Sequence, residues 1–246
     1  MSTSALGVTV GDYLDTWLTG KQAPKTVEIY LTLADNYLVP HLGDIELLEL
    51  RAQHVDRMYA AITLGKGGAT AQPSTIRRIH GVLRSALTTA VKRRLIPYSP
   101  AEHIELAPEN SRRPKPWTIA ECQAFLAGSA EDRLAPPYEL ILATGLRRGE
   151  ALGLRWEDVD FDGAALYVIQ QIVEVHGRPV VGTPKTKHGA RVVSLDTVTV
   201  ATLRRHRSVQ ELERSAWGAG WNETGLVFTR EDGRGLRPQH ATKGSR

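Results

Sequence analysis

The chain is poor in cysteine and has no long apolar run, and each absence excludes a class of protein. Cys122 is the only cysteine among 246 residues, so no disulfide can close within the chain and no thiolate cluster can hold zinc. No apolar stretch is long enough to span a membrane, and the first residues lack the basic-then-apolar pattern of a secretory signal. We therefore expect a cytoplasmic protein without a membrane segment.

The composition is that of an ordinary globular protein with a modest excess of positive charge. Hydrophobic residues make up 41% of the chain and charged residues 24%, and the formal net charge is +4. A chain of 246 residues can form one large or two modest domains. The basic balance is compatible with a polyanionic partner but does not identify one.

The first part of the chain is predicted to be entirely helical. Its apolar residues recur at helical spacing, and the spacing predicts helices over residues 8–18, 26–38, 51–64 and from Pro73 to about Arg94. The last of these carries the clearest stripe, with apolar side chains close to the i, i+3, i+4, i+7 rule: Ile76, Ile79, Leu83, Leu87, Ala90 and Val91.

The opposite face of that last helix combines cations with small residues. On a helical wheel the cations share an arc with Gly81, Ser85 and Thr88, and they are Arg77, Arg78, Arg84 and Lys92. Small residues among cations would let a helix approach a phosphate backbone closely. A cationic helix face that is simply solvated is the alternative interpretation.

The second part of the chain mixes helices and strands. Residues 107–117 hold three prolines and three cations without apolar periodicity, which predicts an extended linker. A capping box at Thr118 and Glu121 starts a helix to about Ala127. Two prolines, 136 and 137, precede a helix predicted from Tyr138 to Thr144, and another is predicted from Thr197 to about Ala216. Strands are predicted at residues 165–174, 191–195 and 226–229. This pattern predicts an α+β domain with one small antiparallel sheet.

One stretch has a chemical rather than a structural pattern. In residues 143–156 (ATGLRRGEALGLRW), Gly145 permits a left-handed turn and two arginines, Arg147 and Arg148, follow where a helix begins. The helix dipole disfavours cations at that end. A guanidinium placed there suits bidentate contact with phosphate. Solvated surface arginines are the alternative.

This stretch, with the Glu-Asp-Val-Asp that follows it, resembles the first arginine motif of the tyrosine recombinases of the phage-integrase branch. The resemblance implies that Arg147 binds the scissile phosphate and that Glu150 supports the arginine turn. It implies a helical, SAM-like core-binding domain over residues 1–107, a linker over 108–117 and a catalytic domain over 118–246. The linker would follow DNA, with its phosphate contacts made by Arg112, Arg113 and Lys115.

A second stretch, residues 183–195, places lysines at a predicted hairpin tip. Lysine can donate a proton as well as neutralise charge, although lysines at such tips also serve solubility. The family has a hairpin lysine that protonates the leaving 5′-oxygen. The resemblance gives that role to Lys185, with Lys187 as the alternative.

The other residues of the family's chemistry are not found in order. The family continues with His-x-x-Arg, a second histidine or tryptophan and a tyrosine nucleophile, and it uses no metal or other cofactor. Here the His-x-x-Arg strings are residues 54–57 and 188–191, Tyr167 precedes the lysines, and His240 has no arginine at the right spacing. We therefore expect a catalytic domain that is incomplete at its C-terminus and has lost strand cleavage.

Three functional hypotheses follow for the chain. In the first, it is a recombination or integration protein that binds the duplex DNA of an attachment or core site. In the second, it only binds DNA and competes there with a full-length integrase. In the third, it is a non-functional remnant. The absence of the family's exchanged C-terminal segment predicts a monomer when DNA is absent.

Overall fold

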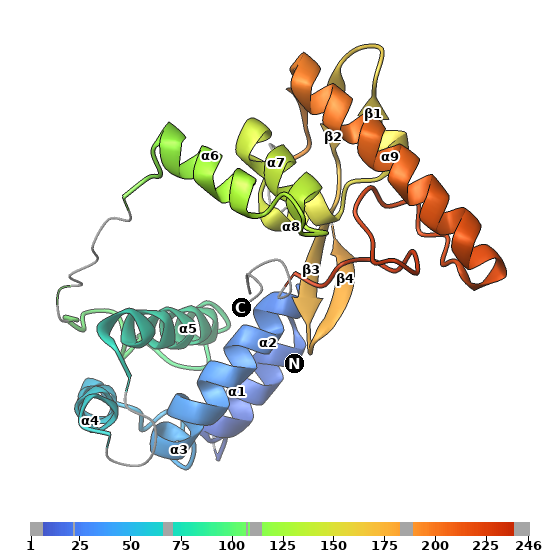
Figure 1. Ribbon diagram of the computed structural model, residues 1–246. Helices are drawn as coiled ribbons and strands as arrows, with labels where there is room; N and C mark the ends of the chain where they lie inside the picture. The colour runs from blue at the N-terminus through green and yellow to red at the C-terminus, as the bar shows by residue number, and fades with distance from the viewer. Residues whose placement is uncertain are drawn as a thin grey trace. The chain divides into compact units, whose positions relative to one another are not determined.

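The computed structural model describes residues 7–21, 23–65, 71–106, 108, 115–182 and 189–238 (Figure 1). The chain divides into two compact units, residues 1–113 (unit 1) and 114–246 (unit 2). Each unit has a hydrophobic core of its own. Within the described ranges, none of the helices has the length and apolar character that crossing a membrane requires.

The regular elements among the described residues of unit 1 are helices, as predicted, apart from an isolated bridge between Thr9 and Glu46. Its elements are α1 (Val10–Thr19), α2 (Pro24–Leu33), a π-helical turn (Ala34–Leu38), α3 (Val39–Leu42), α4 (Ala52–Thr63) and α5 (Pro73–Lys92). The helix predicted over residues 26–38 begins earlier, because Pro24 occupies the first helical position, where its missing N–H is not needed.

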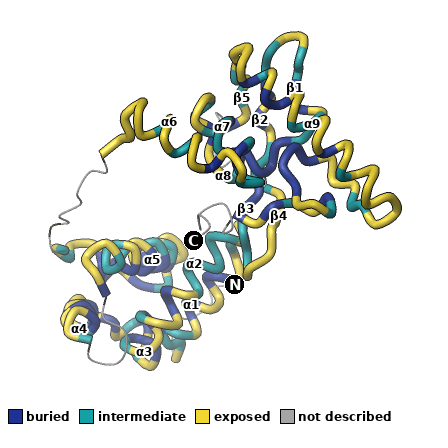
Figure 2. Tube along the Cα trace, in the orientation of Figure 1, coloured by how far each residue is buried: buried dark blue, intermediate teal, exposed yellow. Residues whose placement is uncertain are grey.

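The core of unit 1 draws side chains from all of its helices, and α5 packs against α2 and the π-helical turn. The apolar stripe predicted on α5 is buried at Ile79, Leu83 and Leu87. Buried and exposed positions both occur along α5 (Figure 2). The Tyr13 hydroxyl of α1 donates a hydrogen bond of 2.7 Å to the Ala86 carbonyl oxygen of α5. Because this face of α5 lies in the core of unit 1, its opposite face is exposed.

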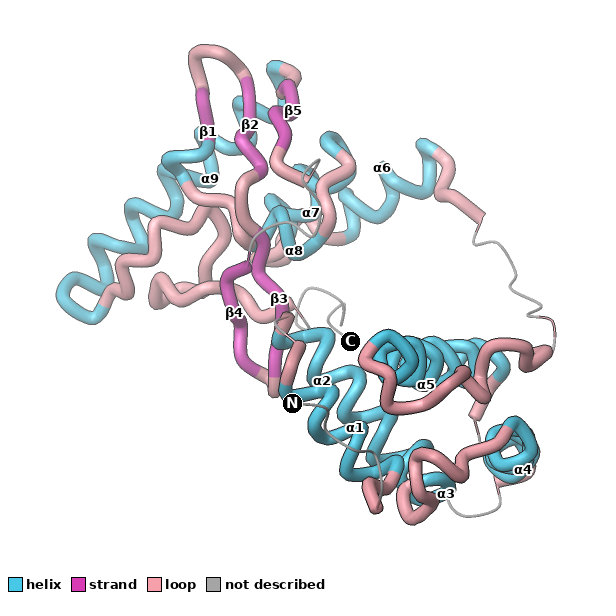
Figure 3. Tube along the Cα trace, turned by 180° about the vertical axis from the view of Figure 1, so that it is seen from behind, coloured by secondary structure: helices cyan, strands magenta, loops and turns pink. Residues whose placement is uncertain are grey.

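The described residues of unit 2 form helices and two small antiparallel sheets (Figure 3). The sheets have strand orders β1-β2-β5 and β3-β4. The elements are α6 (Ile119–Gly128), α7 (Ala135–Thr144), α8 (Arg148–Leu152), a 3-10 turn (Trp156–Asp158), β1 (Val159–Asp160), β2 (Ala165–Val168), β3 (Gln171–Val175), β4 (Arg178–Gly182), β5 (Arg191–Ser194), α9 (Thr197–Trp217) and a 3-10 turn (Gly218–Gly220). The predicted α+β class is confirmed, but the strands form two separate sheets where one was predicted.

The prediction of one continuous strand over residues 165–174 is wrong. β2 pairs with β1 and β5, whereas β3 pairs only with β4 across a turn at His176 and Gly177, both at positive φ. Between the two strands, the side-chain amide of Gln170 donates a hydrogen bond of 2.7 Å to the Gly153 carbonyl oxygen. This contact holds the chain where it leaves one sheet for the other, and the Val/Ile-rich composition carries no sign of it.

The strand predicted over residues 226–229 is also absent, and only isolated bridges to Arg155 and Gly235 form there. The segment is buried, yet much of its backbone hydrogen bonding is to side chains. The Gln210 amide of α9 donates to the carbonyl oxygens of Leu226 and Val227 at 3.3 and 3.1 Å. A segment whose carbonyl groups accept from side chains in this way does not need a neighbouring strand.

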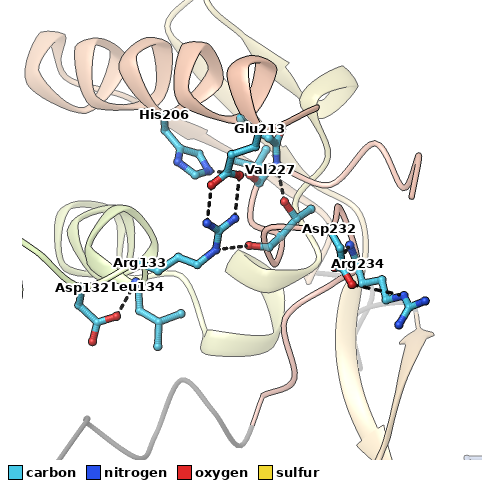
Figure 4. Close-up of polar contacts among 10 residues, drawn as sticks. Asp132, Arg133, Leu134, His206, Glu213, Val227, Asp232 and Arg234 are labelled. Carbon is cyan, nitrogen blue, oxygen red and sulfur yellow. Dashed lines mark hydrogen bonds and ion pairs between the residues drawn. The ribbon is translucent and has the colours of Figure 1, made fainter. Parts of the chain in front are cut away.

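A polar clasp completes the hydrogen bonding of this segment (Figure 4). The Arg133 guanidinium binds the Glu213 carboxylate of α9 through both terminal nitrogens, with Nη2 at 2.8 Å from Oε2, and its Nε donates to the Thr229 carbonyl oxygen at 3.1 Å. His206 Nε2 lies 2.8 Å from the Val227 carbonyl oxygen. The Arg133 clasp, formed by Arg133, Glu213 and Thr229, therefore ties the segment before α7 to α9.

Candidate functional site

The site is built at the turn between α7 and α8. α7 ends at Gly145, which has a φ of 67° and donates its N–H to the Ile141 carbonyl oxygen at 2.9 Å. This left-handed end of the helix favours glycine, because a side chain there would be strained. Leu146 is buried after it, and Arg147 is the N-cap residue of α8. The turn predicted from the sequence is therefore present.

Glu150 fixes Arg147 in this turn. Its Oε2 accepts the backbone N–H of Arg147 at 2.9 Å, and its Oε1 accepts Nη1 of the same residue at 2.8 Å. The side chain of Glu150 is 1% exposed and that of Arg147 is 75% exposed. The carboxylate at the start of α8 also offsets the unfavourable position of the arginine near the helix dipole.

A second arginine binds the same carboxylate. Arg191, the first residue of β5, places Nη2 at 2.9 Å from Oε2 and Nη1 at 3.2 Å from Oε1 of Glu150. The sequence pattern included this arginine but gave it no role. The available signal was its inward-facing position, since Arg191 and Val193 alternate with the exposed Val192 and Ser194.

The electrostatics of Glu150 follow from these contacts. Burial by itself would raise the pKa of the carboxyl group. The hydrogen bonds from Arg191, from the Arg147 backbone and from the Arg147 side chain outweigh burial and lower the pKa to about 2. Glu150 is therefore ionised throughout the neutral range, and it carries one negative charge between two guanidinium groups.

The remaining predicted site residues fall into two groups. On α5, Arg78, Arg84 and Lys92 are exposed, whereas Arg77 is half-buried and makes a contact of its own. Gly81 and Thr88 lie exposed on this face, and an added Cβ on Gly81 would meet no atom. We call these residues the α5 cationic face. Lys115 is exposed, whereas Arg112, Arg113, Lys185 and Lys187 lie outside the described residues.

The described residues offer no site for a metal. No group of three or more histidine, cysteine, aspartate or glutamate side chains that could hold an ion occurs among them. The chemistry of the described site is that of guanidinium groups arranged around one carboxylate. Such an arrangement suits binding of an oxyanion.

Comparison with known proteins finds integrases and tyrosine recombinases among the proteins that the chain resembles. No protein-family model matches the chain. It is 29% identical over 237 residues to an integrase of Streptomyces ambofaciens, covering 94% of this chain and 60% of that protein. It is 28% identical to a tyrosine recombinase XerC-like protein of Caldanaerobacter subterraneus, covering 92% of this chain and 63% of that protein. The chain thus spans less than two thirds of these relatives.

Solved structures share the fold. The Tn1549 transposon integrase in complex with a circular intermediate DNA has a TM-score of 0.76 at 19% identity, covering 94% of this chain and 74% of that one. The lambda integrase dimer bound to a COC′ core site has a TM-score of 0.64 at 18% identity, covering 95% and 61%.

The helical unit, the α+β unit and the arginine turn together define a protein of the integrase fold. The curated relatives are an integrase and a tyrosine recombinase XerC-like protein, so the comparisons support the tyrosine recombinase family indicated by the motif around Arg147. The resemblance stated from the sequence is confirmed.

Proposed function

We propose that this chain is the DNA-binding and phosphate-contacting part of a site-specific recombination or integration protein. The observation that carries the proposal is the Arg147 guanidinium, which is held by the buried Glu150 and is still 75% exposed. A guanidinium that is fixed at one nitrogen and open at the others suits a phosphate of duplex DNA. In the family that phosphate is the scissile one.

The two units have different proposed roles. Residues 1–107 form the core-binding domain, residues 108–117 the linker and residues 118–246 the catalytic domain. The division of the chain near Arg113 and Pro114 supports this assignment. The α5 cationic face binds the DNA backbone, as do the linker cations Arg112, Arg113 and Lys115. Lys185, with Lys187 as the alternative, holds the position of the family's general acid.

We expect a cytoplasmic monomer when DNA is absent. Tyr167 is an ordinary residue of the sheet and not a nucleophile, since it lies in the central strand β2 opposite Val192 of β5. The purified chain should therefore form no covalent adduct with nicked core-site DNA. A Tyr167-dependent adduct would refute this assignment.

The decisive experiment is a selection from a random duplex pool at low and at moderate salt. Recovery of one motif, with affinity that falls in the Arg147→Ala variant, supports the proposal, because phosphate contacts fix a protein on its site. A motif recovered without any dependence on Arg147 would instead favour a DNA-binding competitor that does not use the catalytic turn. Binding that is unspecific and lost at moderate salt would contradict sequence recognition and favour a remnant.

A further inference from the structure

We propose that Arg191 is a positioning residue for the phosphate contact of Arg147, acting through the Glu150 carboxylate that both arginines bind. This inference rests on the proposed function, because it concerns how Arg147 is held and charged. It adds a residue from β5 to a turn that the sequence motif confines to residues 143–156.

The contacts of Glu150 are shared evenly between the two arginines. Oε1 accepts from Arg147 Nη1 at 2.8 Å and from Arg191 Nη1 at 3.2 Å, and Oε2 accepts from the Arg147 backbone at 2.9 Å and from Arg191 Nη2 at 2.9 Å. A carboxylate offers about four acceptor positions, so these four donors fill it. Rotation of the carboxylate would break contacts to both arginines at once.

The two arginines differ in side-chain exposure and in how many guanidinium nitrogens bind Glu150. The Arg191 side chain is 32% exposed and reaches Glu150 with both terminal nitrogens, whereas Arg147 is 75% exposed and uses one. The backbone of Arg191 is also fixed, since it pairs with Val168 of the central strand β2. Arg191 therefore holds the Glu150 carboxylate in place, and the Arg147 guanidinium remains exposed to solvent.

Arg191 also decides the charge of the site. Glu150 with Arg147 alone would be neutral, and an incoming phosphate would compete with Glu150 for the only guanidinium. With Arg191 included, the three side chains carry a net charge of one positive unit. Charge within a few ångströms of a partly exposed site changes anion binding substantially. Arg191 thus satisfies Glu150 and leaves Arg147 available for phosphate.

The test uses the full chain and inorganic phosphate as the probe. The side-chain Nε–H resonance of Arg147, assigned by its loss in Arg147→Lys, is followed during a phosphate titration at constant ionic strength. We expect Arg191→Gln to weaken phosphate binding about fivefold or more, and Arg191→Lys to restore part of the loss because it keeps the charge. Arg205→Gln is the matched control, because it removes one exposed cation of α9 in the same unit.

The outcomes separate this inference from the function on which it rests. If the Arg147 resonance of the unmodified protein does not respond to phosphate, the phosphate-contacting function fails. If it responds and Arg191→Gln binds phosphate as tightly as the unmodified protein, the positioning role is overturned. An equal loss in Arg205→Gln would also overturn it, since general charge would then explain the effect.

The folding of unit 2 distinguishes a positioning role of Arg191 from a merely structural one. The indole resonance of Trp156 and the cooperative melt should be unchanged in Arg191→Gln while phosphate binding falls. Should Arg191→Gln fail to fold, Arg191→Lys is compared with Arg205→Lys in the same titration. Unchanged phosphate affinity in Arg191→Lys would then overturn the positioning role, because lysine cannot reproduce the two-point contact with Glu150.

Discussion

A Cβ atom on Gly149 would lie 2.7 Å from the carbonyl oxygen of Ile172, so α8 rests directly on the backbone of β3. Gly153, at the end of the same helix, would bring a Cβ to 2.9 Å from Cα of Gln171. The two glycines therefore let the helix that begins after Arg147 lie against the β3-β4 ribbon. The position of the arginine turn depends on this close approach.

Gly149→Ala should destabilise unit 2 although alanine favours helices. The added methyl group meets backbone that cannot move aside, and overpacking of this kind costs about 1–3 kcal/mol, which outweighs a helix-propensity gain of about 1 kcal/mol. Urea unfolding followed by Trp156 fluorescence measures the change. Gly182→Ala is the control, because its Cβ would meet nothing within 4 Å. A stability equal to or above that of the unmodified protein would show that α8 can shift away from β3.

The stability of unit 2 should fall in acid because of Glu150. Its pKa is about 2 in the folded protein, below the ordinary value of 4.5, so its contribution is complete above pH 4.5 and is lost as the pH falls toward 2. The linkage is worth about 3 kcal/mol for a carboxyl group as buried as this one. Glu150→Gln should be less stable at neutral pH and should lack this pH dependence. Urea midpoints between these pH values test it, and equal slopes in the two proteins would contradict the assignment.

Reversing charges on the α5 cationic face should weaken binding to duplex DNA. Arg78→Glu combined with Arg84→Glu removes two exposed cations, and each lost phosphate contact should reduce the slope of log affinity against log salt by about 1. Arg57→Glu on α4 is a control in the same unit, since Arg57 is exposed and lies off this face. Fluorescence anisotropy across a salt series gives the slopes. If the double variant and the control have the same slope, the face is only solvated surface.

Breaking the Arg133 clasp should destabilise unit 2 more than removing an exposed arginine nearby. Arg133→Ala leaves the Glu213 carboxylate and the Thr229 carbonyl oxygen without this donor, at a cost of about 2–4 kcal/mol. Arg230→Ala is the control, because Arg230 is exposed and directly follows Thr229 in the sequence. A double-mutant cycle of Arg133→Ala with Glu213→Ala should give a coupling of about 1–3 kcal/mol. Additive effects would show that the two side chains act independently.

The helices were predictable because their signals are local. Thr118 and Glu121 form the capping box that starts α6, Gly145 takes the left-handed conformation that ends α7, and the stripe of Ile79, Leu83 and Leu87 is buried as its spacing predicts. Each signal involves residues at most a few positions apart, so the surrounding fold leaves it unchanged.

The strands were less predictable because their partners are distant. The break between β2 and β3 depends on Gln170 reaching Gly153, and the loss of the strand at residues 226–229 depends on side chains of α9. β-propensity alone predicts an apolar segment that fits a sheet, and it does not say whether a sheet edge is there to receive it.

The sequence by itself indicated the resemblance to the tyrosine recombinases and, through that resemblance, the support of the Arg147 turn by Glu150, which lies three positions away on the same helical turn. Only the tertiary structure decided that Arg191 binds the same carboxylate from 41 positions away. The physical reason is the range of the interactions. A cap is completed within its own turn, whereas a buried carboxylate takes its remaining donors from whichever strand the folded chain places beside it.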